Sequence, residues 1–258
     1  QPISNYPDVK VYTRLGTNDQ TVIPGFADTW EEKTVGIELK EEDGWVYAQT
    51  DGSEGSGLEL TFTFPMGLYY RDDKGKLLYE WVRVQPEYRK VGETEWKPWP
   101  NITKKTFAAR RTSLNTFTVS NDRTDYFRKY TKISLIYDEG ITEAIVLTSS
   151  YNYSSGNTTV TVDNEVFGGL STVEIHYIEI DKKTNSPFSY TTRTDNVGEG
   201  QYEVRCRIIK EGISERRTNT TVWAKLTHII YDDFTRPGKS LVGIQALATD
   251  RLSGSLNV

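Results

Sequence analysis

Few residues of this chain are of the types that carry catalysis or bind metals. Its 258 residues include two histidines and one cysteine. His176 and His228 each lie in a stretch that alternates apolar and polar residues, and no carboxylate stands near them at the spacing of a zinc site. We interpret both as surface or half-buried strand histidines and expect no metal site.

Cys206 lies between Arg205 and Arg207, and neighbouring cations favour a reactive thiolate. Successive side chains of a strand point to opposite faces, however, so both arginines would lie on the other face. We therefore interpret Cys206 as a buried structural thiol. A single cysteine cannot form an internal disulfide, so the chain is either made in a reducing compartment or does not depend on oxidation for its stability; a bacterial cytosol fits best.

Neighbouring carboxylates occur at four places that we predict to be turns: Glu31 and Glu32, Glu41 to Asp43, Asp72 and Asp73, and Asp232 and Asp233. Each stands beside Gly, Lys or Pro, so we interpret them as solvated loop charges rather than as acid–base pairs. The chain also lacks a phosphate-binding loop, a dinucleotide fingerprint and a nucleophile elbow. These residues predict neither an enzyme nor a cofactor site.

The stretch SSYNYSSGN offers a different chemistry. Tyr151 and Tyr153, with Asn157, would combine aromatic contact area with amide hydrogen bonding, which suits a sugar or another protein. Tyrosines are equally ordinary on exposed sheet faces. These three residues are therefore a candidate site for contact with a partner or a glycan.

Charge and hydropathy restrict the partners. The formal net charge is −5 with acidic and basic residues interspersed, so the basic surface that nucleic acids require is missing. No segment reaches the roughly 20 apolar residues of a membrane span, and no signal peptide pattern opens the chain. We expect a soluble protein that neither binds nucleic acid nor inserts into a membrane.

Alternation of apolar and polar residues predicts strands throughout the chain. Leu58, Leu60, Phe62 and Phe64 would share one face of a strand, and LLYEWVRV after the turn RDDKGK is expected to pair with it as a hairpin. A second hairpin would lead through Gly92 to WKPW. Two further strands are predicted in GQYEVRCRIIKEG and TTVWAKLTHIIYD.

The composition and the spacing of the predicted strands change from about Ser113 to Asp181. In this segment, short strand-like runs rich in Thr and Ser recur at intervals of about 8 to 12 residues. We interpret this segment as a small barrel or sandwich inserted into a loop of a surrounding sandwich, since surface loops tolerate insertions. No convincing helix is found. Only TKKTFAARR is dense in helix formers, and we interpret it as a single turn or a linker.

Three stretches resemble the tip attachment protein J family of long-tailed bacteriophages, the central hub and host-specificity protein of the tail tip. The first is VYTRLGTNDQTVIPGF from Val11, and the second runs from Leu58 through FPMGLYYRDDKGK to WKPW. The third and most specific is TVWAKLTHIIYDDFTRPGKSLVGIQALATDRLSG from Thr221.

The third stretch departs from the family pattern at two positions. Arg236 replaces the usual aromatic residue before Pro237, and Ser240 stands where Ala is common. The resemblance covers roughly Val11 to Trp99 and Gly200 to Gly254, and it leaves the segment between them as a separate module.

The resemblance implies an all-β fold: a fibronectin III-like β-sandwich interrupted by an inserted small β-barrel or sandwich module. The expected parts are an N-terminal β segment (1–57), a discontinuous sandwich (58–112 and 182–236), the inserted module (113–181) and the truncated start of a following hub domain (237–258).

The family also implies a role. It indicates a non-catalytic structural segment of a phage or prophage tail tip, which scaffolds tail-tip assembly and host attachment. Other tail-tip proteins and a host surface receptor are the expected partners, the full-length parent is expected to be a homotrimer, and the location is the virion after assembly in the bacterial cytoplasm. No cofactor and no catalytic residue is implied.

Two other hypotheses stay open. One is a carbohydrate-binding module that recognises host envelope glycans through Tyr151, Tyr153 and Asn157. The other is a hydrolase of the cell wall or capsule, which rests on the unassigned carboxylates alone.

The two ends of the chain raise a separate expectation. The chain begins at Gln1 and closes shortly after the strand-like run Leu241 to Leu247, so we expect an internal fragment. Its tail would be either disordered after about Gly238 or paired with a borrowed edge strand, because an unpaired strand exposes its backbone donors and acceptors.

Overall fold

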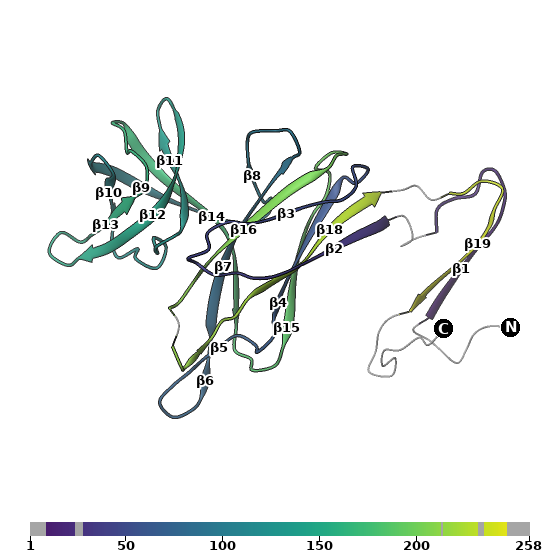
Figure 1. Cartoon of the computed structure of the whole chain (residues 1–258), viewed down its shortest axis with the longest axis horizontal. Helices are drawn as coiled ribbons and strands as arrows, with labels where there is room; N and C mark the ends of the chain where they lie inside the picture. Colours follow the sequence, from purple (N-terminus) through teal and green to yellow (C-terminus); the bar gives the residue numbers. More distant parts are fainter. Residues whose placement is uncertain (1–8, 24–27, 213, 232–234, 247–258) are drawn as a thin grey trace.

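A computed structural model describes residues 9–23, 28–212, 214–231 and 235–246 of the chain (Figure 1). These residues form strands, turns and loops but no helix, and accordingly no helix among them is long and apolar enough to cross a membrane. Figure 1 shows a barrel at one end, a sandwich in the middle and a separate two-stranded ribbon at the other end.

Two sheets facing each other form the sandwich. One has the order β15 (Phe188–Thr194), β4 (Gly57–Phe64), β18 (Val222–Tyr231) and β2 (Asp28–Glu38). The other contains β7 (Glu80–Lys90), β16 (Tyr202–Lys210) and β3 (Val46–Gln49), with β8 (Lys97–Pro98) also paired to β7. A small sheet of β17 (Arg217–Thr218), β5 (Tyr69–Arg71) and β6 (Leu77–Leu78) flanks them.

The sandwich core lies between the two sheets and follows from the alternation of each strand. The inward residues of β4 and β18 meet those of β7 and β16, and all are buried: Leu58, Leu60, Phe62, Phe64, Trp223, Leu226, Val82, Val84, Val204, Cys206 and Ile208. Each large apolar side chain buried in this way contributes about 1.5 to 3 kcal/mol to stability.

Six further strands close into the barrel. In order around it they are β11 (Lys132–Tyr137), β12 (Gly140–Asn152), β13 (Asn157–Val162), β10 (Thr116–Ser120), β9 (Thr103–Ser113) and β14 (Leu170–Lys182). β14 pairs back to β11, which leaves this sheet without an open edge. The barrel has its own core, in which the rings of Phe117 and Phe127 meet edge to face at 5.7 Å. The prediction of an all-β fold with a small barrel is confirmed.

One strand belongs to both bodies. The first part of β14 pairs with β9 and β11 in the barrel, whereas Ile178 to Lys182 pair with Val84 to Glu80 of β7 in the sandwich. The barrel therefore continues the sandwich sheet through an unbroken backbone ladder.

The interpretation of TKKTFAARR as a turn or linker is wrong, because this stretch lies in β9. It pairs with β10 on one side and β14 on the other, and Phe107 and Ala109 pack against the barrel core. Its helix formers carry only a weak intrinsic preference, which pairing on both sides outweighs.

The predicted hairpin between the strand at Leu58 and the strand at Leu78 is also wrong. β4 pairs with β15 and β18, whereas β7 lies in the opposite sheet. The turn after Arg71 joins only β5 and β6; its Asp72 carboxylate accepts bonds from the backbone N–H groups of Lys74 and Lys76, at 2.9 and 2.8 Å. Alternation defined the buried face of β4 correctly but carries no information on its partner.

The ribbon consists of β1 (Val9–Leu15) and β19 (Ser240–Ala246), paired antiparallel. Its turn side is held by Gln20, whose amide donates to the carbonyls of Thr235, Arg236 and Lys239 at 2.6 to 3.0 Å. Of the two expected fates of the tail, the structure has the pairing, and the partner is β1 of the same chain. Residues 247–258 lie outside the described residues.

Candidate contact site

The hairpin of β12 and β13 carries all three residues that the sequence singled out. Tyr151 lies near the end of β12, Tyr153 lies in the turn, and Asn157 opens β13 opposite Asn152. Tyr153 is 89% exposed, and its ring meets that of Tyr151 edge to face at 4.9 Å. The structure therefore brings the three residues together at one protruding tip.

The turn that presents these side chains is held by its own backbone and by the barrel. The Asn152 side-chain oxygen accepts bonds from the N–H groups of Ser154 and Ser155 at 2.9 and 3.1 Å, which is an Asx turn. Gly156 has a φ of 67°, and its carbonyl accepts a bond from Asn121 at 2.8 Å. A tip ordered in advance loses little conformational entropy when it binds.

The chemistry of this tip is contact rather than reaction. Paired tyrosine rings supply a large amphipathic surface with few rotatable bonds, and their hydroxyls can donate or accept hydrogen bonds. Asn157 is paired with Asn152 and Tyr151 with Thr158, so the Asn157 amide points to the other face of the hairpin from the Tyr151 ring. Such a surface fits a sugar face or a protein loop.

A buried polar cluster sets the position of the barrel, and hence of the tip, against the sandwich. Gln85 of β7 accepts a bond from the Lys132 N–H at 2.8 Å and donates to the carbonyls of Lys132 and His176 at 2.8 and 2.9 Å. The Lys132 ammonium, whose side chain is 10% exposed, pairs with Glu87 of the sandwich and Glu143 of the barrel. Because buried charges are costly unless paired, this cluster favours one orientation.

The outer face of the second sandwich sheet carries a stack that the sequence analysis missed. Its guanidinium groups and indole rings alternate at 4.4, 4.2, 4.1 and 5.0 Å in the order Arg89, Trp96, Arg205, Trp45 and Arg207. The period-two spacing of Arg205 and Arg207 was a signal that both share a face. The tryptophans come from distant segments, so their insertion between arginines could not be read from local pattern.

Arg205 links this stack to the buried cluster. It donates two bonds to the Glu87 carboxylate, at 2.8 and 2.6 Å, and Glu87 also pairs with Lys132. Arg–aromatic contacts of this kind contribute about 0.5 to 2 kcal/mol each. The stack therefore stiffens the face of the sandwich on which the barrel sits.

The two histidines differ. His176 is partly exposed and lies 3.4 Å from Glu174, as expected of a strand histidine. His228, in contrast, is 1% exposed and not half-buried: its ring fits against Gly55, where an added Cβ would lie 2.3 Å from it. The described residues contain no group of three His, Cys, Asp or Glu side chains that could hold a metal.

Cys206 is confirmed as a buried thiol. It is fully buried in the sandwich core, and burial raises its pKa well above the ordinary value, with the Glu87 charge adding to the shift. The neutral thiol is a poor nucleophile, so Cys206 is inert.

The carboxylates that were predicted to lie in turns differ in where the structure places them. Glu31 and Glu32 lie in β2 rather than in a turn, because β2 pairs along β18; Glu32 there meets Lys225 at 2.5 Å. Glu41 to Asp43 lie in a turn, as predicted, and the Glu41 carboxylate accepts a bond from the Lys210 N–H at 3.0 Å. Asp72 caps the β5–β6 turn, as described above. Asp232 and Asp233 lie outside the described residues.

Comparison with known proteins gives a family. The model of the tip attachment protein J FNIII-A domain matches residues 29–135 and 145–232. This match includes much of the barrel, which the resemblance in the sequence analysis left aside. No curated protein matches the chain.

Two solved structures of phage capsid proteins align with this chain at low TM-scores. VP17, a capsid protein of bacteriophage P23-77, is 11% identical over 79% of this chain and 96% of its own, with a TM-score of 0.17. A chain of the VP16–VP17 complex of the same phage is 11% identical over 79% of this chain and 98% of its own, also with a TM-score of 0.17. Scores this low do not establish a common fold.

The family match spans well over half of the chain and both of its β bodies, and the sandwich that it describes is the one observed. The chain therefore belongs to the phage tip attachment protein J family, as its fibronectin III-like FNIII-A domain, with a structural role in the phage tail, other phage structural proteins as partners and the virion as its location.

Proposed function

We propose that this chain scaffolds the tail tip without catalysing a reaction and holds the Tyr151–Tyr153–Asn157 tip outward for host attachment. One observation carries the proposal: the most exposed aromatic side chain of the tip stands on a barrel that is joined to the sandwich by a shared strand and a buried ion-pair cluster. Because the barrel is joined rigidly to the sandwich, the place where the sandwich is anchored fixes the position of the tip.

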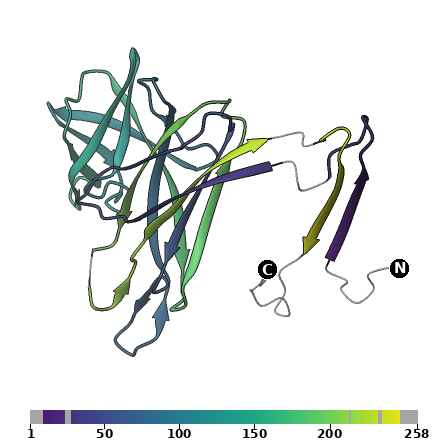
Figure 2. The same cartoon turned by 45° about the vertical axis from the view of Figure 1, so that its right-hand side comes forward.

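The arrangement of the three bodies supports this role. The ribbon and the barrel lie at opposite ends of the sandwich, and a turned view shows the same separation (Figures 1 and 2). An attachment at the ribbon end would therefore leave the barrel free to reach a partner. The tail tip proteins next to it would contact the ribbon and the sandwich edges.

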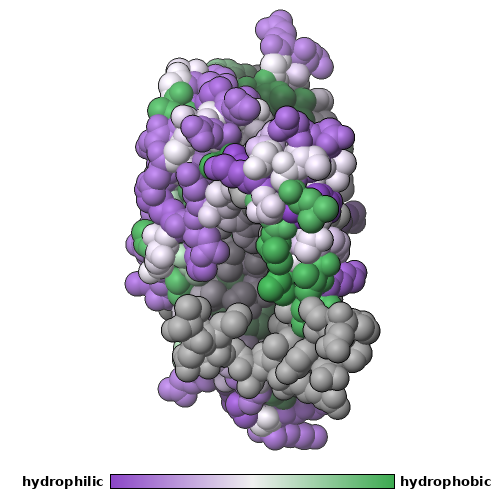
Figure 3. Space-filling model, turned by 90° about the vertical axis from the view of Figure 1, so that its right-hand side faces the viewer, coloured by the Kyte–Doolittle hydropathy of each residue, from purple (hydrophilic) through white to green (hydrophobic). Residues whose placement is uncertain are grey.

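The ribbon carries an exposed apolar face of the kind that packs against another protein surface. By register, Val11, Leu15, Val242 and Ile244 share one face, and they are 41 to 86% exposed. Figure 3 shows an apolar strip on the side of the molecule that it views. We propose that residues 237–258 are the start of a hub domain and that this apolar face packs against the rest of that domain. We also propose that the full-length parent is a homotrimer.

The boundaries 1–57, 58–112 with 182–236, 113–181 and 237–258 are likewise a proposal. The strand pairs cross them at β2, β3 and β9, which contribute to bodies assigned to later ranges. Limited proteolysis followed by mass spectrometry would locate the boundaries, and cleavage within β9 would contradict the pairing seen here.

The host-attachment role is tested in the phage. Tyr151→Ala and Tyr153→Ala are introduced together into the full-length parent, and Tyr79→Ala, which removes an exposed sandwich tyrosine, is the matched control. We expect particles of both variants to assemble with a trimeric parent, and only the double variant to adsorb more slowly to host cells. Unchanged adsorption of the double variant would contradict the role of the tip.

A carbohydrate-binding module is the second candidate, favoured by the edge-to-face tyrosine pair, of which Tyr153 is 89% exposed. It predicts that the purified chain binds host envelope glycans on an array and loses binding with the double tyrosine variant. Binding of a host protein but no glycan would favour a protein receptor. Turnover of peptidoglycan or capsule would contradict the non-catalytic role.

A further inference from the structure

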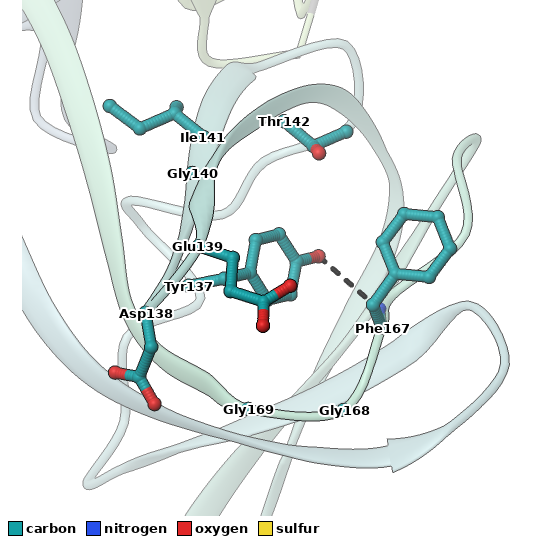
Figure 4. Close-up of a pocket in the computed structure, with 9 residues that line it drawn as sticks. All are labelled: Tyr137, Asp138, Glu139, Gly140, Ile141, Thr142, Phe167, Gly168 and Gly169. Atoms are coloured by element: carbon teal, nitrogen blue, oxygen red, sulfur yellow. Dashed lines mark hydrogen bonds between the residues drawn. The ribbon is translucent and has the colours of Figure 1, made fainter.

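A hollow of about 480 Å³ lies at the end of the barrel opposite the tyrosine tip (Figure 4). It sits between the β11–β12 hairpin and the loop that leads into β14. Gly140 at this end and Tyr151 at the other are separated by nearly the whole length of β12. The lining residues are Tyr137, Asp138, Glu139, Gly140, Ile141, Thr142, Phe167, Gly168 and Gly169.

Two aromatic rings form a wall of this hollow. Tyr137 and Phe167 meet edge to face at 5.9 Å, and the Tyr137 hydroxyl accepts a bond from the Phe167 N–H at 3.3 Å. Phe167 is 49% exposed. An apolar ring held in place and left half open to solvent is a surface that a ligand can cover.

The floor of the hollow is open backbone. An added Cβ at Gly168 or Gly169 would meet no atom within 4 Å, so no neighbouring side chain closes the space over them. Gly169 has a φ of 81°, a conformation that few other residues adopt. The loop can therefore lie close to a bound molecule.

The charge around the hollow has one sign. Its charged lining side chains are Asp138 and Glu139, and Figure 4 shows the Glu139 carboxylate in front of the Tyr137 ring. Arg111 contacts the loop outside the lining and donates to the Val166 carbonyl at 2.5 Å. Carboxylates beside aromatic rings stabilise a positive charge, both directly and through the ring faces.

We propose that this hollow binds a small organic cation, with an ammonium group between the Glu139 carboxylate and the Tyr137 and Phe167 rings. The volume falls in the range of small-molecule sites, and barrel mouths commonly hold such sites. The proposal is independent of the tyrosine tip, which lies at the other end of β12.

The ammonium group has two sources that the experiment separates. Isotope-labelled protein is titrated with choline, which represents an envelope or headgroup ammonium, and with Nα-acetyl-lysine methylamide, which represents a peptide. Methyl glucoside is the neutral probe. We expect backbone signals of Gly168 and Gly169 to shift with one or both cations at millimolar concentrations and to stay unchanged with the sugar.

Variants assign the effect to the hollow. Asp138→Asn with Glu139→Gln should weaken cation binding about tenfold or more, since a charge-assisted contact is lost, and Phe167→Ala should weaken it as well. Glu42→Gln removes an exposed carboxylate elsewhere and Tyr79→Ala an exposed ring on the sandwich; neither should change binding.

Three outcomes would overturn the proposal: no shift with either cation at millimolar concentrations, equal binding by the carboxylate variant, or stronger binding of the sugar. Asp138 and Glu139 are exposed, so their variants should fold. Unchanged spectra away from the loop would verify this.

Discussion

The sandwich and the barrel are made of similar alternating strands, yet they differ in how their sheets end. The sandwich sheet β15–β4–β18–β2 has two open edges, whereas the six barrel strands close on themselves. Open edges invite pairing with other chains, and closure removes them. The difference suits a body that meets neighbouring tail proteins and a body that projects from it.

The two bodies also depend on each other unequally. β14 completes the barrel, but only its last residues extend a sheet of the sandwich. The sandwich has its own core around Phe62 and Trp223. The barrel core around Phe117 shares no residue with the sandwich core. We therefore expect loss of the sandwich to disturb the barrel more than the reverse.

The largest expected effect tests this inequality. Phe62→Ala and Phe117→Ala each delete a fully buried ring and should cost about 3 to 5 kcal/mol. Hydrogen exchange should show that Phe62→Ala exposes β14 along its whole length, whereas Phe117→Ala exposes barrel strands and leaves β4 and β18 protected. Equal exposure of both bodies by both variants would mean that they unfold as one unit.

The next effect concerns the junction. Lys132→Met leaves Glu87 buried with Arg205 alone and should cost about 3 kcal/mol. It should also increase the motion of the barrel relative to the sandwich, which NMR relaxation detects as separate tumbling. Lys97→Met removes an exposed pair with Glu93 and should change stability little. A rigid barrel in Lys132→Met would show that β14 alone holds it.

A third effect is local to the sandwich. Gly55→Ala places a Cβ against the buried His228 ring and should cost about 1 to 3 kcal/mol. Gly212→Ala meets no atom within 4 Å and should change stability little. Thermal unfolding of the two variants measures the difference, and similar melting temperatures would show that the ring moves at little cost.

The smallest effect compares one carboxylate from each body. Burial raises the pKa of Glu80 in the sandwich above its ordinary value of 4.5, although Arg217 opposes this. Burial alone would also raise the pKa of Glu174 in the barrel, but its contacts with Lys104 and His176 lower it overall.

The two shifts give opposite pH dependences. The folded chain holds the Glu80 proton more tightly than the unfolded chain, so the stabilising contribution is present below pH 4.5 and is lost as pH rises through the raised pKa. The contribution of Glu174 is present above pH 4.5 and is lost as pH falls through the lowered pKa.

Urea unfolding at several pH values tests both signs. As pH rises, the free energy of unfolding of the wild type should fall relative to that of Glu80→Gln. The stability difference between wild type and Glu174→Gln should shrink as pH falls, from at most about 1 kcal/mol near neutrality. Parallel curves for the two variants would contradict the assignment.

Particular residues show which features of the structure could be predicted from local sequence pattern. Alternation identified the inward faces of β4 and β16, and Cys206 was correctly expected in the core. The tip residues Tyr151, Tyr153 and Asn157 fell within one loop region, so their proximity followed from short sequence separation. The Arg–Trp stack and the Lys132 cluster join residues far apart in the chain, such as Trp45 with Arg207 and Glu87 with Arg205, and no local pattern specifies such contacts.

The sequence by itself determined the strand character of most of the chain, the buried sides of β4 and β16 and the scarcity of catalytic groups, because a period of two and residue types are local properties. Only the tertiary structure decided that β4 pairs with β15 and β18, that β9 is a barrel strand and that β14 joins the two bodies. The physical reason is that a strand satisfies its backbone hydrogen bonds with any neighbour in register, so the choice among partners depends on how whole sheets pack.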